Sequence, residues 1–557
     1  MKKLIFFLFI IVSLSLSAQK HNHTHYFSKY KFTEADTIRG MLRPERTNFD
    51  VTFYNLDIKV DVENRFLSGF VDVHFEAVED IDRLQLDLYK NMKVKSVEWY
   101  GKTIPHERIH DAFFVDFPSM IAKGKSSQVR VHYEGKPTIA QNAPWDGGFV
   151  WDKDRNGNPW VGVACEGDGA SMWWPCKDHL TDEPDSMSIK IAVPDDLVCA
   201  ANGELRQKKT MPDGYTRYDW FVSYPINSYN VSVNIADYAN FKETYTAEDG
   251  DTLELDYYVL SYNLEKAKKH FKQTHKVLAC FEKYFGKYPF WEDGFGMVET
   301  PYLGMEHQGA IAYGNKYMRG YLGGLVPPDM KWDYIIVHET GHEYFGNSIS
   351  AGDIAEVWIH ESFTTYMEAL YVECTTTYED AVRYLQSQRG FIRNQEPIVG
   401  PLNVNFEGWG GSDQYYKGSW MLHTLRHAIA DDEMWFDLLR SFYNRYAISV
   451  VKTEDFVNFV NQCTKRDYSP FFEQYLFHPS IPVLEYRLKQ KGKKLQVEYR
   501  WQTDVEALDM PILVGTKNAY TRIEPTSEWK KTTLPKTNEA DFKVATELFY
   551  VDTKRLD

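Results

Sequence analysis

The spacing of apolar residues changes twice along this chain of 557 residues, and this change constrains the fold more than any other feature. From about 41 to 240, apolar and polar residues alternate, which is typical of strands that bury one face. From about 260 to 475 the spacing is helical, and after residue 481 the alternation returns. The pattern predicts a multidomain α+β protein with an antiparallel β domain, a mostly helical domain and a small C-terminal β domain.

The same pattern gives the expected domain boundaries. We expect the N-terminal β domain over 41–245, the helical domain over 246–480 and the C-terminal β domain over 481–557. Residues 19–40 are expected to form an N-terminal extension. Within the helical domain, the pattern over 263–285 predicts one amphipathic helix. Apolar residues make up 43% of the chain and aromatic residues 15%, which is enough to fill a core in each domain.

The first residues predict a targeting segment. Two lysines precede an apolar run over 4–16, and small residues follow up to Ala18. This is the pattern of a secretory signal peptide over 1–18, and its apolar run is too short for a membrane-spanning helix. Cleavage after Ser17 and cleavage after Ala18 both fit. We therefore expect an exported, soluble protein, periplasmic or secreted, with no membrane span; the sequence leaves the oligomeric state open.

Charge and cysteine content narrow the possible partners. The formal net charge of −16 at pH 7 disfavours nucleic acid and anionic membrane surfaces as partners. The six cysteines are scattered, and no two of them have CxxC spacing. Six cysteines in a chain of this size do not form a disulfide scaffold, so buried free thiols are expected. A bridge between Cys165 and Cys176 is the alternative.

Two histidines and two glutamates predict a metal site. His338 and His342 lie four positions apart, with Glu339 beside the first and Glu361 nineteen positions after the second. Positions i and i+4 share one face of a helix, so both imidazoles can reach one ion. A zinc ion held by two histidines and Glu361 keeps its fourth position open for water, and Glu339 can take a proton from that water. The chain is predicted to be a zinc hydrolase with one Zn²⁺ per chain.

The surroundings of this motif predict that its helix is buried. The four residues at 334–337 are too apolar for a solvated face. Two prolines indicate a helix start near 327–329, and a glycine-asparagine pair indicates its end near 346–347. A second helix is expected over about 353–374, and it carries Glu361.

Further motifs, in the same order along the chain, resemble those of the M1 (gluzincin) zinc aminopeptidases, and the resemblance covers nearly all of 41–557. HExxH alone occurs in many proteases, whereas the full set in this order is highly specific. The matching segments are the eighteen-residue gap between His342 and Glu361, YLGMEH at 302–307 for the family's GxMEN motif, YFGKYPF at 284–290 before it, YYKG at 415–418 for its YxKG segment, and the stretches at 164–166, 174–178 and 182–185 for the part of the β domain that binds the substrate amine.

The resemblance implies a fold and an activity. It implies a thermolysin-like, mostly α catalytic domain over 246–480 and a C-terminal β-sandwich over 481–557, in a short form without the C-terminal helical domain of larger members. A cleft that is more open to long peptides would follow from this short form. The implied activity is that of a zinc-dependent aminopeptidase, which hydrolyses the N-terminal peptide bond of peptides with a free N-terminus.

The resemblance also assigns residues that bind the substrate. Glu306 and Glu166 would hold its amine, because a charge-assisted hydrogen bond to an ammonium group is strong in a recessed pocket. Asp168 is a rival for the role of Glu166, since the residues around that glutamate differ from the commoner family text. Gly304 would begin an edge strand over 304–310 that lies along the peptide.

Tyr415 is the implied donor to the oxyanion, and the neighbouring Tyr416 is the alternative. The chain departs from the family at two positions where asparagine is usual: His307 follows the motif glutamate, and His360 precedes Glu361. Neither removes a catalytic group. Two rival functions stay open at this point, namely a metalloendopeptidase that uses the same zinc and a catalytically inactive binding module.

Three further patterns are interpreted as non-catalytic. His423 and His427 share a helical face, but no carboxylate is placed to complete a metal site. The histidine-rich stretch at 21–25 is interpreted as a disordered tail that follows the cleavage site, with weak metal binding as the alternative. The stretch at 152–157 begins like a calcium loop, yet Val163 stands where the bidentate glutamate would be, so a hairpin turn is expected there.

Overall fold

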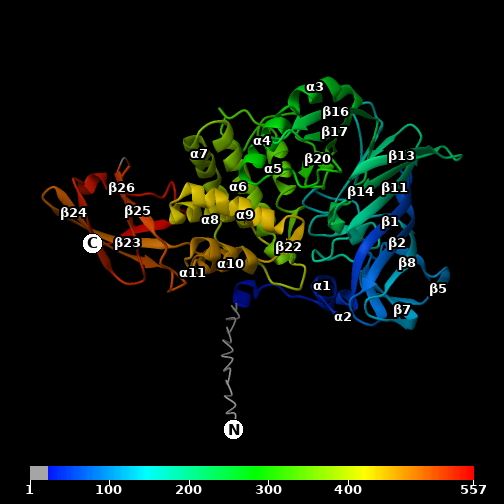
Figure 1. Cartoon of the computed structure of the whole chain (residues 1–557), viewed down its shortest axis with the longest axis horizontal. Coiled ribbons are helices and arrows are strands. Elements are labelled where there is room, and N and C mark those ends of the chain that lie inside the picture. The colour runs from blue at the N-terminus through cyan, green and yellow to red at the C-terminus, as the bar shows by residue number, and fades with distance from the viewer. Residues whose placement is uncertain (1–22, 518) are drawn as a thin grey trace, which may run out of the picture.

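The computed structural model describes residues 23–517 and 519–557, so the expected signal peptide over 1–18 lies outside the described residues. Figure 1 shows a β-rich region at one end, a helical region in the middle and a small β region at the other end. This is the multidomain α+β architecture that the sequence predicts. Among the residues that the structure describes, none of the helices has the length and apolar character needed to span a bilayer.

The N-terminal region is built around an eight-stranded sheet with the order β13-β14-β11-β1-β2-β8-β4-β5. Neighbouring strands are antiparallel except β1 and β11, which run parallel. Along β1 the buried residues alternate from Leu56 to Val60, as the sequence predicts. The strands are β1 (Phe49–Asp61), β2 (Phe66–Ala77), β4 (Met92–Trp99), β5 (Lys102–Ile104), β8 (Ser126–Gly135), β11 (Ser186–Pro194), β13 (Glu204–Thr210) and β14 (Tyr215–Val222).

Two smaller sheets complete this region, with the orders β3-β7-β6 and β12-β15-β10-β9. Strand β10 ends at Ala164, two residues before Glu166, and the Tyr302 hydroxyl donates to the Val163 carbonyl at 2.7 Å. This bond joins the end of β10 to the segment that leads to Glu306. The strands are β3 (Ile81–Asp87), β6 (His106–Ile109), β7 (Ala112–Ile121), β9 (Gly148–Lys153), β10 (Pro159–Ala164), β12 (Val198–Ala200) and β15 (Asn234–Ala236).

The middle region combines a five-stranded sheet, in the order β16-β17-β18-β20-β19, with a group of helices. The boundary expected at residue 245 falls inside β16, which pairs with β17 and so belongs to this sheet. The strands are β16 (Tyr238–Thr246), β17 (Thr252–Leu260), β18 (Phe295–Glu299), β19 (Gly304–Met305) and β20 (Ile311–Tyr313). The helices are α3 (Leu264–His270), α4 (Gln273–Tyr284), α5 (Tyr334–His342), α6 (Trp358–Thr375), α7 (Tyr378–Gln388), α8 (Asp413–Ile429), α9 (Asp432–Tyr446), α10 (Thr453–Thr464) and α11 (Ser469–Phe477), with a short pair of strands, β21 (Ile349–Ala351) and β22 (Ser449–Val451), among them.

Two expectations for this region need correction. The single helix expected over 263–285 is two helices, α3 and α4, because the chain turns at Phe271, whose buried ring packs against Tyr257 and Tyr313. The edge strand expected over 304–310 is only the two residues of β19. The chain then turns, with the amide of His307 donating to the carbonyl of Met305 at 2.9 Å.

The C-terminal region consists of a four-stranded sheet, β27-β24-β23-β29, and a three-stranded sheet, β26-β25-β28. The expected alternation holds along β24, where Leu495, Val497, Tyr499 and Trp501 are buried. One apolar core runs from the five-stranded sheet through the helices into these strands, and a second core fills the N-terminal region. The strands are β23 (Val483–Lys491), β24 (Lys494–Gln502), β25 (Ile512–Thr516), β26 (Ala519–Ile523), β27 (Lys530–Pro535), β28 (Lys543–Val544) and β29 (Asp552–Arg555).

A disulfide joins Cys280 in α4 to Cys374 at the end of α6. The expectation of free thiols was therefore wrong for this pair, whose separation of 94 residues gives no local sequence signal. The alternative bridge is absent, since Cys165 and Cys176 are both buried free thiols. The disulfide ties together two helices of the middle region.

Three histidines outside the predicted metal site, the buried His423 and the partly buried His179 and His427, have environments that favour the neutral ring. Burial lowers the pKa of His179 to about 4 and that of His427 to about 4, and it lowers the pKa of His423 well below its ordinary value. His179 accepts from the Thr181 amide through one ring nitrogen, and its other ring nitrogen lies 3.3 Å from the Gly40 carbonyl. These neighbours suit a neutral ring with a single proton.

Acid should therefore destabilise the fold through these histidines. Between pH 6.5 and 4 these histidines bind protons in the unfolded chain but not in the folded chain, so their contribution to stability is greatest above pH 6.5 and falls as the pH drops. Each such histidine contributes about 1.4 kcal/mol per pH unit within that window. In a His423→Leu variant, the free energy of unfolding should therefore fall less steeply with decreasing pH, by about 1.4 kcal/mol per pH unit. Urea unfolding of both proteins between pH 7 and pH 4.5 measures the difference, and parallel curves would contradict it.

Candidate metal centre and peptide cleft

Helix α5 begins at Tyr334 because Asp333 caps it, and not near 327–329 as expected. One carboxylate oxygen of Asp333 accepts from the amides of Ile335 and Ile336. Its other oxygen accepts from the Tyr313 hydroxyl at 2.7 Å and lies 2.6 Å from Nε2 of His270. The helix also ends earlier than expected, at His342. These contacts fix the start of the helix that carries both histidines.

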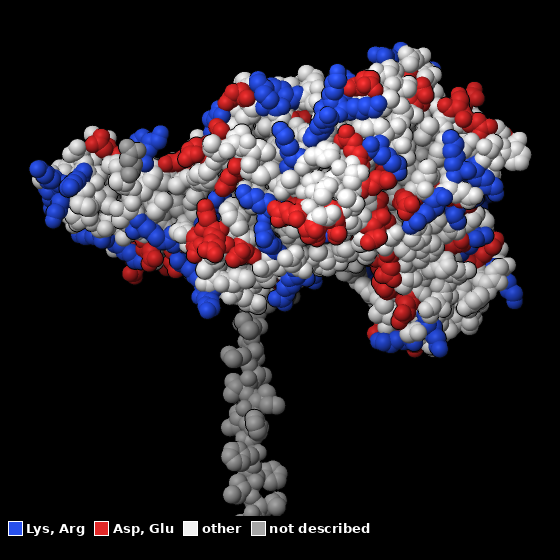
Figure 2. Space-filling model, turned by 45° about the horizontal axis from the view of Figure 1, so that its top comes forward, with Lys and Arg blue, Asp and Glu red and all other residues white. Residues whose placement is uncertain are grey.

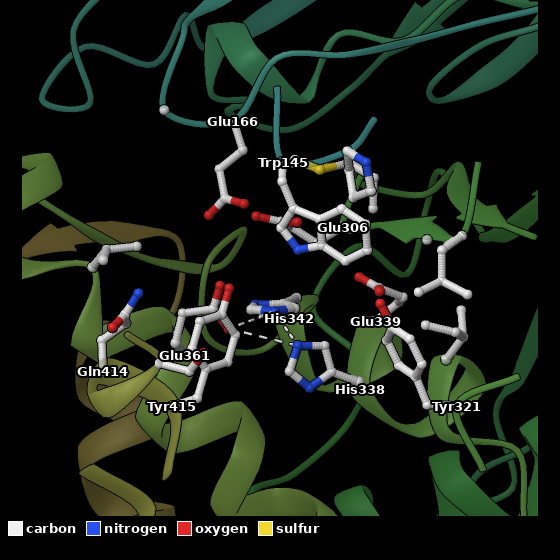
Figure 3. Close-up of a pocket in the computed structure, with 18 of the residues that line it drawn as sticks. Trp145, Glu166, Glu306, Tyr321, His338, Glu339, His342, Glu361, Gln414 and Tyr415 are labelled. Atoms are coloured by element: carbon white, nitrogen blue, oxygen red, sulfur yellow. Dashed lines mark hydrogen bonds and ion pairs between the residues drawn. The ribbon is translucent and has the colours of Figure 1, made fainter. Parts of the chain in front are cut away.

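The three predicted metal ligands converge on one point. Nε2 of His338 lies 3.1 Å from Nε2 of His342, and the two nitrogens lie 3.5 and 3.4 Å from Oε2 of Glu361 (Figure 3). Bonds of 2.0–2.1 Å at a tetrahedral zinc ion place neighbouring ligand atoms about 3.3 Å apart. Oε2 of Glu361 is buried and makes no hydrogen bond. The donor set and its geometry therefore fit one zinc ion.

Each histidine is oriented by a partner at Nδ1. Nδ1 of His338 lies 2.7 Å from Glu368, and Nδ1 of His342 lies 3.0 Å from the Phe345 carbonyl. These acceptors favour a proton on Nδ1 and leave Nε2 free for a metal. Glu368 is itself held by the Tyr384 hydroxyl at 2.6 Å. The role of Glu368 was not predicted, although it follows Glu361 by seven positions and so lies on the same face of α6.

Glu339 and Gly304 meet where β19 passes α5. A side chain at Gly304 would bring its Cβ within 2.6 Å of Oε1 of Glu339, so this close approach requires glycine. Both residues line the cavity that also contains the three ligand side chains. Burial raises the pKa of Glu339 to about 7, although the imidazoles of His338 and His342 oppose that rise. A carboxylate with this pKa is suited to accept and release a proton near neutral pH.

Glu306 and Glu166 face one another across the same cavity (Figure 3). Their carboxylates and a ring nitrogen of His360 all lie within 4.8 Å of one another. The Tyr229 hydroxyl donates to Glu306 at 3.2 Å, and Glu306 is only 3% exposed. Burial, followed by the negative charge of Glu306, raises the pKa of Glu166 well above its ordinary value. Two carboxylates this close favour a cation between them.

Asp168, the rival of Glu166, lies outside the residues that line this cavity. Its carboxylate accepts from the Gly147 amide at 2.6 Å and so holds a neighbouring loop instead. The cavity has a volume of about 470 Å³ and is lined by five glutamates but by no lysine or arginine. Over the face of the molecule seen in Figure 2, acidic and basic side chains are interspersed. The concentration of acidic groups is therefore a property of the cavity.

Tyr415 stands at the start of α8 and lines the cavity beside Glu361 (Figure 3). Its ring stacks on His338 with a centroid distance of 6.2 Å. Burial, followed by the charge of Glu361, raises the pKa of its hydroxyl well above the ordinary value, so the group stays a hydrogen-bond donor. Tyr416 also lines the cavity, but its ring packs against Phe391 at 5.3 Å.

Helix α8 is held close to α6 by two contacts near Tyr415. The Ser362 hydroxyl donates to the Gln414 carbonyl at 2.6 Å. A Cβ on Gly418 would lie 1.7 Å from that hydroxyl oxygen, so only glycine allows this approach. In the same turn, the buried Lys417 donates from Nζ to the carbonyls of His478 and Pro479, each at 2.8 Å. Tyr415 is thereby fixed relative to Glu361.

A Gly418→Ala variant should misplace Tyr415. The added methyl group must push α8 away from α6, which we expect to cost about 1–3 kcal/mol of stability. We expect kcat to fall by about 10- to 100-fold, since small misplacements of catalytic groups have effects of that size. Steady-state kinetics and thermal unfolding measure both effects. Gly390→Ala is the matched control, because no atom lies within 4 Å of a Cβ built at that position; equal behaviour of the two variants would contradict the prediction.

The expectation of a disordered tail was wrong for residues 23–25, which belong to the short helix His23–Phe27, whereas residues 21–22 lie outside the described residues. The other two non-catalytic patterns have local explanations. The rings of His423 and His427 pack edge to face with centroids 4.6 Å apart, and Nε2 of His427 lies 2.8 Å from the Tyr378 hydroxyl. No carboxylate joins them in the clusters of possible metal ligands found among residues 23–517 and 519–557. Asp154 accepts from the amides of Asn156 and Asn158, each at 2.9 Å, and so closes the predicted hairpin turn.

Comparison with known proteins agrees with this geometry. The family model described as the Peptidase M1 N-terminal domain matches residues 51–230, and the model of the Peptidase family M1 domain matches 269–475. Mouse Aminopeptidase B is 25% identical over 287 residues, which are 49% of this chain and 41% of that protein. Leucyl aminopeptidase of Saccharolobus solfataricus is 19% identical over 465 residues, which are 80% of this chain and 56% of that protein. The chain spans about half the length of the curated relatives it matches.

A solved structure supports the fold. The M1 zinc metallopeptidase of Deinococcus radiodurans aligns with a TM-score of 0.65 and 19% identity, over 78% of this chain and 94% of that one. A variant of that protein has been solved with a Tyr-Ser-Ala substrate, at the same TM-score and identity. Zinc is the metal that this fold and the donor set of His338, His342 and Glu361 imply. Since the two family models together match more than half of its residues, the chain belongs to peptidase family M1.

Proposed function

We propose that this protein is a zinc-dependent aminopeptidase that removes the first residue from peptides with a free N-terminus. The observation that carries the proposal is the pair formed by Glu306 and Glu166 in the cavity that also contains the three zinc ligands. Both carboxylates can accept charge-assisted hydrogen bonds from one ammonium group. An ammonium held there fixes the first peptide bond, and no other, near the metal site.

The side chains around that bond can then divide the chemistry. Bound zinc supplies a Lewis acid that makes water acidic enough to lose a proton near neutral pH. Glu339 accepts the proton of the attacking water and passes it to the amine that leaves. The Tyr415 hydroxyl donates to the oxygen on which negative charge develops. Gly304 lets β19 pass close to Glu339, so that a substrate can lie between the strand and the helix.

The acidic pair separates this proposal from its rivals. An endopeptidase must admit chain on both sides of the scissile bond, whereas Glu306 and Glu166 occupy the space that chain before the first residue would need. An inactive binding module would need neither Glu339 nor Tyr415 in the cavity. A panel of fluorogenic amides of single amino acids tests the activity: we expect turnover that a chelator abolishes and zinc restores. Failure of every amide, with zinc bound, would favour the binding module.

A Glu306→Gln variant should bind free amines less well. Loss of the charge removes a hydrogen bond worth about 1.5–3 kcal/mol, so we expect kcat/KM for free-amine substrates to fall by about 10- to 150-fold. The fall should appear mainly in KM. We also expect weaker discrimination between free and N-acetylated substrates, which kinetics on a matched pair of substrates measures. Unchanged discrimination would remove Glu306 from this role.

A further inference from the structure

We propose that Arg39 is a positioning residue for Glu166, and that residues 23–47, here called the N-terminal strap, hold the amine-binding loop in place. The inference rests on the proposed function, because it concerns the loop that presents Glu166 to the substrate. The strap precedes β1 and includes η1 (His23–Phe27), α1 (Glu34–Gly40) and α2 (Pro44–Thr47). It lies outside both segments that match the family models, which begin at residues 51 and 269.

The strap connects the middle region to the N-terminal region. In Figure 1 it runs along the lower edge of the molecule, from beneath α10 and α11 to α1 and α2 beside the β strands. At its start, Phe27 and Tyr30 pack edge-on against Phe406, with centroid distances of 5.1 and 4.8 Å. The Tyr30 hydroxyl donates to Glu396 at 3.0 Å. The strap is thus fastened to the loop at 396–411, which leads into α8 and supplies part of the cavity wall.

Gly40 lets the strap approach this loop closely. A Cβ at Gly40 would lie 2.3 Å from the backbone nitrogen of Asn405, so the two backbones are in direct contact. Asn405 in turn donates from its side-chain amide to the Gly167 carbonyl at 3.1 Å. Gly167 follows Glu166 directly and has a φ of +71°, a backbone conformation that favours glycine. Strap and loop therefore meet beside the residue that follows Glu166.

Arg39 reaches the same carbonyl from the strap. Its Nη2 donates to the Gly167 carbonyl at 3.4 Å and lies 3.8 Å from Asp178, and its Nη1 donates to the Tyr89 hydroxyl. The Tyr89 hydroxyl donates to the carbonyl of Asp168 at 3.1 Å. One guanidinium thus restrains two successive peptide groups of the Glu166 loop, one directly and one through Tyr89.

The backbone at Arg39 is itself held by hydrogen bonds from buried side chains. Arg46, which is fully buried, donates to the Arg39 carbonyl and makes two bonds of 2.8 and 2.7 Å to Asp87. Gln85 donates to the Ile38 carbonyl at 3.0 Å. Asp87 and Gln85 belong to β3, so the position of Arg39 is set by a strand of the N-terminal region. Arg39, which restrains the Glu166 loop, is therefore anchored to a strand of the sheet β3-β7-β6.

Restraint of this loop matters because Glu166 faces a second negative charge. The carboxylates of Glu166 and Glu306 repel one another whenever both are ionised, which is the state in which the pair can hold an ammonium group. Glu306 is fixed by Tyr229 and by the turn after β19, whereas Glu166 sits in a loop with glycines at 167 and 169. Without Arg39, the repulsion would move the loop that carries Glu166. Arg39 thus acts on the amine through Glu166 and touches no substrate.

An Arg39→Met variant tests the proposal by two readouts. The first is hydrogen exchange of the amides at 165–170, which reports on the mobility of the loop whether or not the enzyme turns over. We expect exchange to be about tenfold faster or more, which corresponds to a loss of about 1.4 kcal/mol in the free energy that keeps the loop closed. The second is kinetics on a free-amine substrate, where we expect KM to rise about tenfold with kcat nearly unchanged. Arg39→Lys should recover part of both effects, because lysine keeps the charge but loses the fork of donors.

The controls separate positioning from general destabilisation. Arg130 forms a two-bond ion pair with Asp72 on the same N-terminal region, and Arg130→Met should change neither readout. Adding Glu166→Gln to Arg39→Met should raise KM no further than Glu166→Gln alone. If Arg39→Met does not fold, Tyr89→Phe removes the same link to Asp168 and should give a smaller change of the same kind. Unchanged hydrogen exchange of the amides at 165–170 would overturn the positioning role of Arg39. The proposed function fails instead if the unmodified protein does not hydrolyse substrates with a free amine.

Discussion

Replacing Glu339 with Gln is expected to abolish turnover and to leave zinc bound. The three ligand atoms that lie 3.1–3.5 Å apart belong to His338, His342 and Glu361. Glu339 contributes none of them, so the metal site stays complete. The amide of Gln cannot accept the proton of the attacking water. Positioned proton transfer contributes about 10²–10⁴-fold to rates, and we expect kcat to fall by about 10³-fold or more. Metal analysis of the purified variant, together with kcat, measures both parts.

Glu343→Gln is the matched control for this prediction. Glu343 lies just past the end of the same helix, is buried, and accepts from the Tyr288 hydroxyl and the Gly309 amide, each at 2.9 Å. Burial raises its pKa to about 8, so its carboxyl is largely protonated at neutral pH and an amide can replace it. We expect this variant to keep its turnover. A Glu339→Gln variant that retains substantial activity would remove Glu339 from the role of general base.

Replacing Tyr415 with Phe is expected to lower kcat far more than it alters KM. The hydroxyl lines the cavity beside Glu361 and is placed to donate to the oxygen that becomes negative in the transition state. Loss of one such donor costs about 10²–10³-fold in kcat. The ring of Phe keeps the stacking on His338, so the metal site should be undisturbed. Steady-state kinetics with the amide substrates gives both parameters.

Tyr416→Phe distinguishes the two neighbouring tyrosines. Its ring already packs against Phe391, and loss of its hydroxyl should change kcat little. If Tyr416→Phe shows the larger loss, the donor is Tyr416, and the one-residue gap before the Lys-Gly pair does not identify the catalytic tyrosine. Equal, small losses in both variants would show that neither hydroxyl stabilises the oxyanion.

The parts of the site that the sequence predicted are those with local signals. His338 and His342 share a helix face because of their four-residue spacing, and the apolar residues before them predicted a buried helix. The change of apolar period along the chain separated the strands from the helices. Glu361, by contrast, lies on another helix, so no helix-face spacing relates it to the histidines; its assignment rested on the ligand set that a catalytic zinc ion needs and on the resemblance to the family motif.

The features that the sequence did not predict depend on contacts between distant segments. Cys280 and Cys374 are 94 residues apart, and neither position has a sequence feature that indicates the other. The start of α5 was predicted at two prolines, whereas Asp333 caps the helix through bonds that also involve Tyr313. Arg39 precedes every segment that resembles the family, and its position beside Gly167 appears only when the strap is folded against the loops. Tertiary contacts of this kind leave no periodic pattern in the sequence.

The most direct test of the proposed amine site compares two peptides that differ only at the amine. A hexapeptide with a free N-terminus and its N-acetylated form are each incubated with the zinc-loaded protein, and the products are followed by mass spectrometry. We predict that the free peptide loses its residues one at a time from the N-terminus and that the acetylated peptide stays intact. Cleavage of the acetylated peptide, at its first or at an internal bond, would contradict the role of Glu306 and Glu166 as the site that holds the amine.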